Sequence, residues 1–141
     1  MNRQGAKGAK EVKCEPGAVL DQLANAVIGM AIEVHRVLGP GYLESVYAAA
    51  MEIELRYRNV SFEAQRSIAV EYKGHSVGEG RIDLLIENQL VVELKAVERL
   101  LPIHRAQVIS YLKATGCQLG LLINFNEEVL RTGVKRVVRT E

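Results

Sequence analysis

Residues 80–95 read GRIDLLIENQLVVELK, two apolar runs separated by the polar tripeptide Glu87-Asn88-Gln89. Runs of Leu, Ile and Val that are bounded by glycine and polar residues are typical of β-strands, and the tripeptide is typical of a hairpin turn. A three-residue turn pairs Ile86 with Leu90. This stretch therefore predicts an antiparallel hairpin.

The register of this hairpin brings three ionisable side chains together. Counting back from the turn puts Asp83 directly opposite Glu93, so both carboxylates lie on one face, and Lys95 follows on that face two residues later. A two-residue turn would shift the register by one residue and place the two acids on opposite faces. The predicted chemistry thus depends on a turn with an odd number of residues.

Two carboxylates in this arrangement repel each other. Directly opposed residues have Cβ atoms ~5 Å apart, and two unit charges at that distance repel by roughly 3 kcal/mol at an effective dielectric constant of ~20. A divalent cation held by the oxygens of Asp83 and Glu93 would relieve this repulsion. The alternative is a salt bridge on the strand, in which Lys95 neutralises Glu93 and no metal is needed.

Five short motifs together resemble the GxxExxY family, a branch of the PD-(D/E)XK nuclease superfamily. Their order and spacing carry the resemblance, which extends from about residue 18 to residue 139, and Ile82 replaces the proline that precedes the aspartate in the superfamily. The motifs, in chain order, are Gly41-Tyr42-Leu43-Glu44-Ser45-Val46-Tyr47, Ile82-Asp83, Glu93-Leu94-Lys95, Gln107-Val108-Ile109-Ser110-Tyr111 and Ile123-Asn124-Phe125.

The hydrophobic pattern predicts an α/β fold with a mixed central sheet of four to five strands flanked by helices, and the resemblance implies a restriction-endonuclease-like core. In the second helix the inward side chains are expected to be Val46, Ala50, Ile53 and Leu55. The strand at 119–125 follows a helix of crossover length, so it is expected to lie parallel to the strand at 90–94. The expected helices cover residues 18–38, 43–58 and 102–115, and the other strands cover residues 61–72, a short stretch around 76–77, and 134–138.

The resemblance also implies an activity, the metal-dependent hydrolysis of phosphodiester bonds in nucleic acid. DNA is the expected substrate, and RNA is the open alternative. Asp83 and Glu93 would bind Mg²⁺ or Mn²⁺, with the backbone carbonyl of Leu94 as a further ligand and Glu44 completing the metal shell directly or through water. Lys95 would orient the attacking water or stabilise charge on the phosphate.

Further side chains are candidates for substrate contact. Gln107 would support the nucleophile or hold a phosphate oxygen, and Tyr111, four residues later on the same helix face, would line the pocket. Tyr47 is assigned to the same pocket through its motif, and Arg99 and Arg105 are candidates for phosphate contact. The alternative for Gln107 and Tyr111 is an exposed polar stripe on a helix.

Length and composition agree with one domain. The chain has 141 residues, of which 48% are hydrophobic, and a formal net charge of +1. Residues 1–17 are expected to form a mobile tail, and residues 18–141 a single nuclease-like domain. No apolar run is long enough to cross a bilayer, and Cys14 and Cys117 lack metal-type spacing, so a reduced cytoplasmic protein without a membrane partner is expected.

Two other functions stay open at this stage. The near-neutral charge is unusual for a strongly basic DNA-binding protein, which favours a non-catalytic module that binds nucleic acid or a partner protein and keeps the nuclease fold. The other alternative is a structural homodimer subunit whose acidic cluster belongs to an ion-pair network. In the nuclease interpretation a homodimer or a larger complex is also expected, since a small domain would need a second copy to grip a duplex.

Overall fold

The hairpin predicted from residues 80–95 is confirmed by the structure, a computed structural model that describes residues 16–139. Strand β2 (His75–Ile86) pairs with β3 (Leu90–Lys95), and Ile86 lies opposite Leu90. Glu87 and Asn88 adopt positive φ angles of 55° and 54°, which allow the chain to reverse within three residues. The turn is therefore the odd one on which the register of the acids depends.

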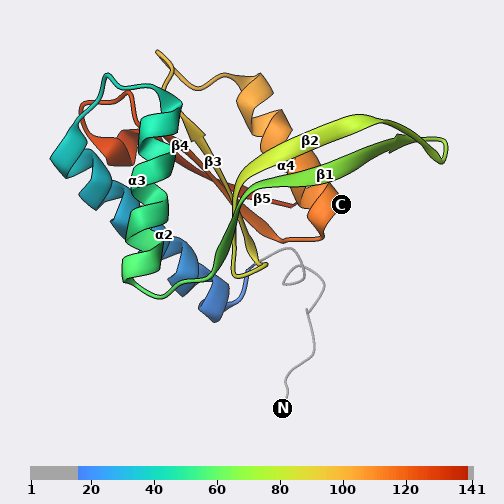
Figure 1. Ribbon diagram of the computed structural model, residues 1–141, viewed down its shortest axis with the longest axis horizontal. Coiled ribbons are helices and arrows are strands. Elements are labelled where there is room, and N and C mark those ends of the chain that lie inside the picture. The colour runs from blue at the N-terminus through green and yellow to red at the C-terminus, as the bar shows by residue number, and fades with distance from the viewer. Residues whose placement is uncertain (1–15, 140–141) are drawn as a thin grey trace, which may run out of the picture.

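The sheet is mixed and has five strands in the order β1-β2-β3-β4-β5 (Figure 1). Strand β3 pairs in parallel with β4, as expected for two strands joined through a helix, and the other neighbouring strands pair antiparallel. The remaining elements are α2 (Ala18–Leu38), α3 (Glu44–Tyr57), β1 (Phe62–Tyr72), α4 (Pro102–Thr115), β4 (Leu119–Asn124), the 3₁₀ helix η1 (Leu130–Gly133) and β5 (Val134–Val138).

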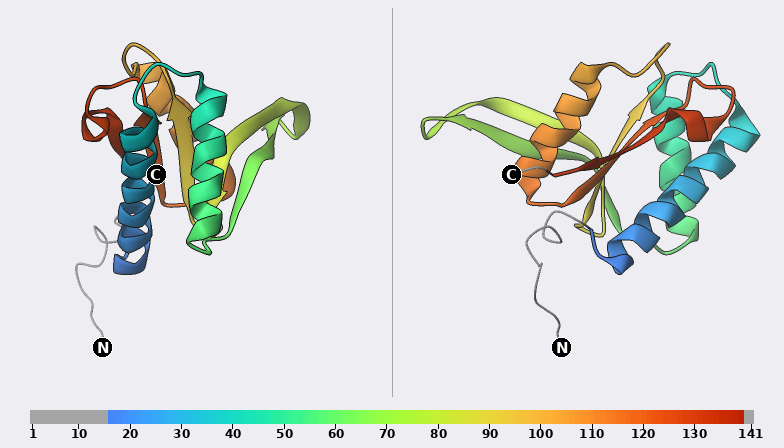
Figure 2. Two further views of the ribbon diagram at one scale, coloured as in Figure 1. Left: turned by 60° about the vertical axis from the view of Figure 1, so that its left-hand side comes forward. Right: turned by 180° about the vertical axis from the view of Figure 1, so that it is seen from behind.

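Helices cover both faces of the sheet (Figures 1 and 2). Helices α2 and α3 pack on one face, over a core that includes Val92 and Leu94 of β3. Helix α4 packs on the other face, where Val91 and Val108 belong to a second core. Because side chains alternate along a strand, Glu93 and Lys95 share the α4 face with Val91.

The predicted inward face of α3 is wrong in part. Val46 and Ile53 are exposed, whereas the buried residues of the helix are Tyr47, Met51 and Leu55. These three recur at four-residue intervals and form a continuous stripe on a helix. The prediction failed because the methionine and the tyrosine were not counted as core residues.

Strand β2 is longer than predicted. The short strand expected around residues 76–77 and the first strand of the hairpin are one continuous strand, His75–Ile86, in which Gly78 and Gly80 pair with Val70 and Ile68 of β1. The outer halves of β1 and β2 consequently extend beyond the other strands as a long two-stranded arm (Figure 1). The carboxylate of Asp83 lies where this arm joins the sheet.

Residues 1–15, to which most of the predicted tail belongs, lie outside the described residues. Within the described part of the chain, no helix is long and apolar enough to cross a membrane.

Candidate functional site

Strands β2 and β3 separate at Asp83 and Glu93, immediately after the backbone pair Leu84 and Val92. The two acids cross this gap. The backbone N–H of Asp83 donates to Oε2 of Glu93 at 2.9 Å, and the backbone N–H of Leu94 donates to Oδ2 of Asp83 at 2.8 Å. Each carboxylate thus accepts a hydrogen bond from a backbone N–H of the opposite strand, in place of a carbonyl of its own strand. We call this arrangement of Asp83 and Glu93 the carboxylate fork.

In the carboxylate fork Glu93 is buried, Asp83 is half-buried, and neither acid has an ion pair among residues 16–139. Glu93 is 2% exposed. Burial, the largest effect, and the negative charge of Asp83 raise the pKa of Glu93 to about 8, against the opposing effects of the Asp83 N–H and of Lys95; Glu44 adds a smaller repulsion. A cation at the fork would hold both acids ionised, because an opposite charge favours the charged form of a carboxyl group.

Lys95 does not neutralise the fork by direct pairing. Within residues 16–139 its ammonium group forms no ion pair within 4.0 Å, although its charge lowers the pKa of Glu93. Its side chain instead lines a cavity of about 350 Å³ with His104, Gln107 and Ser110 of α4. The salt bridge proposed as the alternative to a metal is therefore not formed in this structure.

Helix α4 brings Gln107 to the cavity but buries Tyr111. Nε2 of Gln107 donates to the hydroxyl of Tyr111 at 3.3 Å. Tyr111 belongs to the core under α4, and a Cβ atom on Gly80 would lie 3.0 Å from its ring. Tyr111 therefore packs at the base of the β1–β2 arm and orients Gln107.

Glu44 and Tyr47 belong to the same sequence motif but have different surroundings. Glu44 is exposed in the first turn of α3, and among residues 16–139 no three acidic, histidine or cysteine side chains gather closely enough to hold a metal ion by themselves. Tyr47 is fully buried, donates to the Gly39 carbonyl at 2.6 Å, accepts from the Tyr42 N–H at 3.1 Å and stacks on Phe125. Tyr47 thus fixes the loop before α3.

The two arginines predicted to contact phosphate lie away from the cavity that Lys95 lines. Arg99 is exposed in the segment that leads to α4. Arg105 is exposed on α4 and lines a separate groove with Arg131 and Lys135. The structure thus brings together Asp83, Glu93, Lys95 and Gln107, and it does not bring either arginine into that group.

Sequence reasoning missed Gln65 of β1. Its φ angle is +56°, and it sits between Ala64 and Arg66, which pair with Leu84 and Ile82. Its Nε2 donates to Oδ1 of Asp83 at 3.5 Å. Among residues 16–139 the other non-glycine residues with positive φ lie at turns or at the end of α3, and Gln65 alone lies inside a strand. The polar run Ala-Gln-Arg-Ser was the available signal.

Asn124 is a second residue whose role the sequence did not reveal. Its side chain is fully buried and bonds both backbone groups of Val97, accepting from N–H at 3.0 Å and donating to C=O at 2.9 Å. The N–H of Phe125 donates to the carbonyl of Lys95 at 2.8 Å. The end of β4 therefore fixes the chain just after Lys95, which positions that side chain at the cavity.

The donor set of the carboxylate fork fits a hard divalent cation. One oxygen of each acid is used by a backbone N–H, which leaves Oε1 of Glu93 without a hydrogen bond from the described residues and Oδ1 of Asp83 with the long contact to Gln65 alone. Such ions prefer carboxylate oxygens. The residues present are thus compatible with Mg²⁺ or Mn²⁺.

A mixed sheet with helices on both faces and an acid-x-Lys strand opposite an aspartate defines a nuclease-like α/β fold. A sequence model described as PD-(D/E)XK nuclease superfamily matches residues 21–137, and the chain belongs to this superfamily. The crystal structure of SSO0001 resembles the fold with a TM-score of 0.54 and 18% identity, over 69% of this chain and 50% of that one. The chain spans about half the length of that protein, and the likeness concerns the fold alone. No curated protein matches the chain.

Proposed function

We propose that the protein is a metal-dependent nuclease that hydrolyses phosphodiester bonds of nucleic acid, with DNA as substrate, and that it belongs to the GxxExxY branch of its superfamily. The observation that carries this proposal is the carboxylate fork, in which buried Glu93 faces Asp83 without an ion pair to either acid in the described part of the chain. The backbone N–H of Asp83 and the charge of Lys95 compensate this repulsion only in part, since the pKa of Glu93 is still raised to about 8. A cation bound between the two acids would compensate the rest.

The free oxygens of Asp83 and Glu93 would hold Mg²⁺ or Mn²⁺, the carbonyl of Leu94 would be a third ligand, and exposed Glu44 would act through water. When bound, the ion supplies charge neutralisation and activation of water for attack on phosphorus. The acids themselves position the reacting groups, because each is anchored to the opposite strand by a backbone hydrogen bond.

Lys95 and Gln107 act on the substrate side of the fork. The ammonium group of Lys95, unpaired among residues 16–139, is available to bind a non-bridging phosphate oxygen and to stabilise the charge that develops on it. Gln107, held by Tyr111, orients the attacking water. As the water oxygen bonds to phosphorus, the bond to the leaving sugar oxygen breaks.

Exposed side chains beyond the cavity would extend contact with the substrate. Arg99 and Arg105 flank the amino-terminal part of α4 and would bind phosphates away from the scissile bond, which fixes position without reading sequence. Tyr47 contributes through the core, because its hydroxyl is already bonded to two backbone groups. Two copies of the chain would be needed to cut both strands of a duplex.

Cleavage of end-labelled DNA and RNA with Mg²⁺, Mn²⁺ or EDTA tests the proposal. We expect cleavage that requires the metal and is lost in Asp83→Asn, which keeps the size of the side chain and removes its charge. Glu128→Gln is the matched control, since Glu128 is exposed and outside the fork. Metal binding without cleavage of any substrate would contradict the enzymatic proposal and favour the non-catalytic module.

A further inference from the structure

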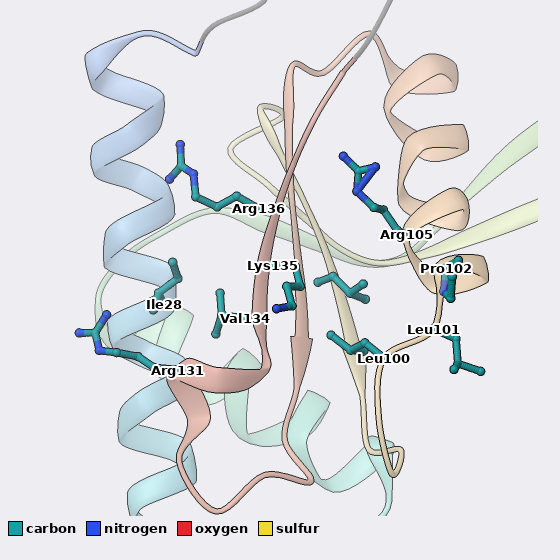
Figure 3. Close-up of a pocket in the computed structure, with 10 residues that line it drawn as sticks. Ile28, Leu100, Leu101, Pro102, Arg105, Arg131, Val134, Lys135 and Arg136 are labelled. Atoms are coloured by element: carbon teal, nitrogen blue, oxygen red, sulfur yellow. The ribbon is translucent and has the colours of Figure 1, made fainter.

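A second concave site lies at the opposite end of the sheet from the β1–β2 arm, along β5 (Figure 3). It is a groove of about 630 Å³. Leu122 and Val134 both line it, although Leu122 belongs to the core under α4 and Val134 packs against the core under α2 and α3. A groove lined from both faces of the sheet must pass around the sheet edge, so it contains the free edge of β5.

At this edge some backbone N–H and C=O groups of β5 point away from β4, toward the groove. The N–H of Arg139 donates to the carbonyl of Gln118, which fixes which residues of the antiparallel β4–β5 ladder face β4. Because this pattern alternates, the N–H and C=O groups of Arg136 and Val138 face away from β4. Strand β5 is the last strand of the sheet in the described part of the chain. Such an edge is a template for one more strand.

The groove combines an apolar lining with uncompensated positive charge. Ile28 of α2 and Leu100 contribute apolar surface from its two sides (Figure 3). Arg105, Arg131 and Lys135 also line it, and within residues 16–139 none of these three cations has an ion pair. No acid is among the described residues that line the groove.

These features distinguish between three candidate occupants of the groove: a second copy of the chain, a nucleic acid and an extended peptide. A second copy paired through β5 would bring unpaired Lys135 close to the same cation of the other copy, and like charges on adjacent strands repel. A nucleic acid gains little from an apolar floor, and no aromatic side chain lines the groove in the described part of the chain to stack on a base. An extended peptide satisfies the strand edge, the apolar lining and the charge together.

We propose that the free edge of β5 binds an extended segment of a partner protein, rich in acidic and aliphatic residues, by strand addition. The backbone of the segment pairs with Arg136 and Val138, its aliphatic side chains cover Ile28 and Leu100, and its carboxylates meet Arg131 and Lys135. This site is separate from the carboxylate fork and does not depend on the proposed nuclease activity.

Fluorescence polarisation with a labelled eight-residue peptide of alternating Glu and Val tests this proposal on the full chain. We expect saturable binding, weakened by roughly tenfold or more in the double variant Arg131→Glu/Lys135→Glu, since each reversal turns an attraction into a repulsion. The charge-matched control is Lys73→Glu/Lys113→Glu, which alters two exposed lysines outside the groove and should change affinity by less than about twofold. Asp83→Asn should bind like the wild type.

Two further probes identify the occupant. The same peptide with alternate amides N-methylated should lose binding, because it cannot pair with an edge strand. Overturning results would be no saturable binding of the unmodified peptide, equal loss in both double variants, or unchanged affinity of the methylated peptide. A thymidine octanucleotide that competes with the peptide and binds more tightly would also overturn the proposal, since it would assign the groove to nucleic acid. Thermal melts of both double variants confirm that each is folded.

Discussion

The carboxylate fork and the β5 groove concentrate opposite charges in one sheet. At the fork, two acids lie where Glu93 is almost fully buried, whereas the unpaired cations of the groove, Arg105, Arg131 and Lys135, lie at the surface or close to it. Water screens the exposed cations of the groove more strongly than it screens the carboxylate of Glu93. The pKa of Glu93 is accordingly raised to about 8. An unpaired charge therefore has a larger effect on chemistry and stability where it is buried than where it is exposed.

The largest contrast should appear when one lysine is removed from each region. Lys95→Ala is expected to lower the rate of nucleic-acid cleavage by about 100-fold or more, because it removes the charge that we propose binds the reacting phosphate. Lys135→Ala should leave the rate within about twofold of the wild type. The measurement is single-turnover cleavage in Mg²⁺. Equal losses in both variants would mean that the lysines act through bulk charge, and the distinction between the regions would fail.

The pH dependence of the free energy of unfolding measures how much the buried carboxyl group of Glu93 destabilises the fold when it ionises. The pKa of Glu93 is about 8 in the folded protein, against an ordinary value of 4.5. The free energy of unfolding of the metal-free protein should therefore fall as the pH rises from about 4.5 to about 8, because the unfolded chain releases a proton that the folded protein retains. Glu93→Gln should therefore exceed the wild type in stability at pH 8 by about 2 kcal/mol or more, and the two should converge near pH 4.5. Urea unfolding in EDTA measures both proteins, and parallel pH profiles would contradict the account.

Tyr47→Phe tests whether the motif around α3 supports the fork only through the fold. The variant loses hydrogen bonds to Gly39 and Tyr42 in a buried position, so its free energy of unfolding should fall by about 1–3 kcal/mol. Its affinity for Mn²⁺ should stay within about twofold of the wild type. Exposed Tyr57→Phe is the control for stability. A lost metal site in a folded Tyr47→Phe protein would give Tyr47 a direct role.

The smallest effect is expected at Gln65, whose strained backbone lies next to Asp83. Gln65→Gly should be more stable than Gln65→Ala by about 1 kcal/mol, because glycine adopts the positive φ angle without strain. Both variants lack the amide near Oδ1 of Asp83 and should bind Mn²⁺ about tenfold more weakly. Chemical unfolding and calorimetry separate the two effects. Unchanged Mn²⁺ affinity in both variants would remove Gln65 from the site.

Local sequence predicted those features that depend on short-range pattern. The turn at 87–89 fixed the register of Asp83 and Glu93, and the crossover helix fixed the parallel pairing of β3 with β4. The role of Tyr47 was not predicted, because its stacking partner Phe125 is distant in sequence.

The polar run Ala-Gln-Arg-Ser indicates an irregularity in β1, but the contact of Gln65 with Asp83 depends on a strand that is distant in sequence. The groove at β5 was likewise hidden, because its cations come from α4, η1 and β5 and meet only in the folded sheet. The hairpin register and the parallel pairing were thus predictable, whereas the contact of Gln65 with Asp83 and the groove at β5 were not.

Calorimetric titration of Mn²⁺ into the metal-free protein tests the central claim most directly, because the carboxylate fork is proposed as a cation site. The account predicts about one bound ion per chain in the wild type and in Glu128→Gln, and no measurable binding in Asp83→Asn. Binding that persists in Asp83→Asn, or its absence from the wild type, would contradict the account.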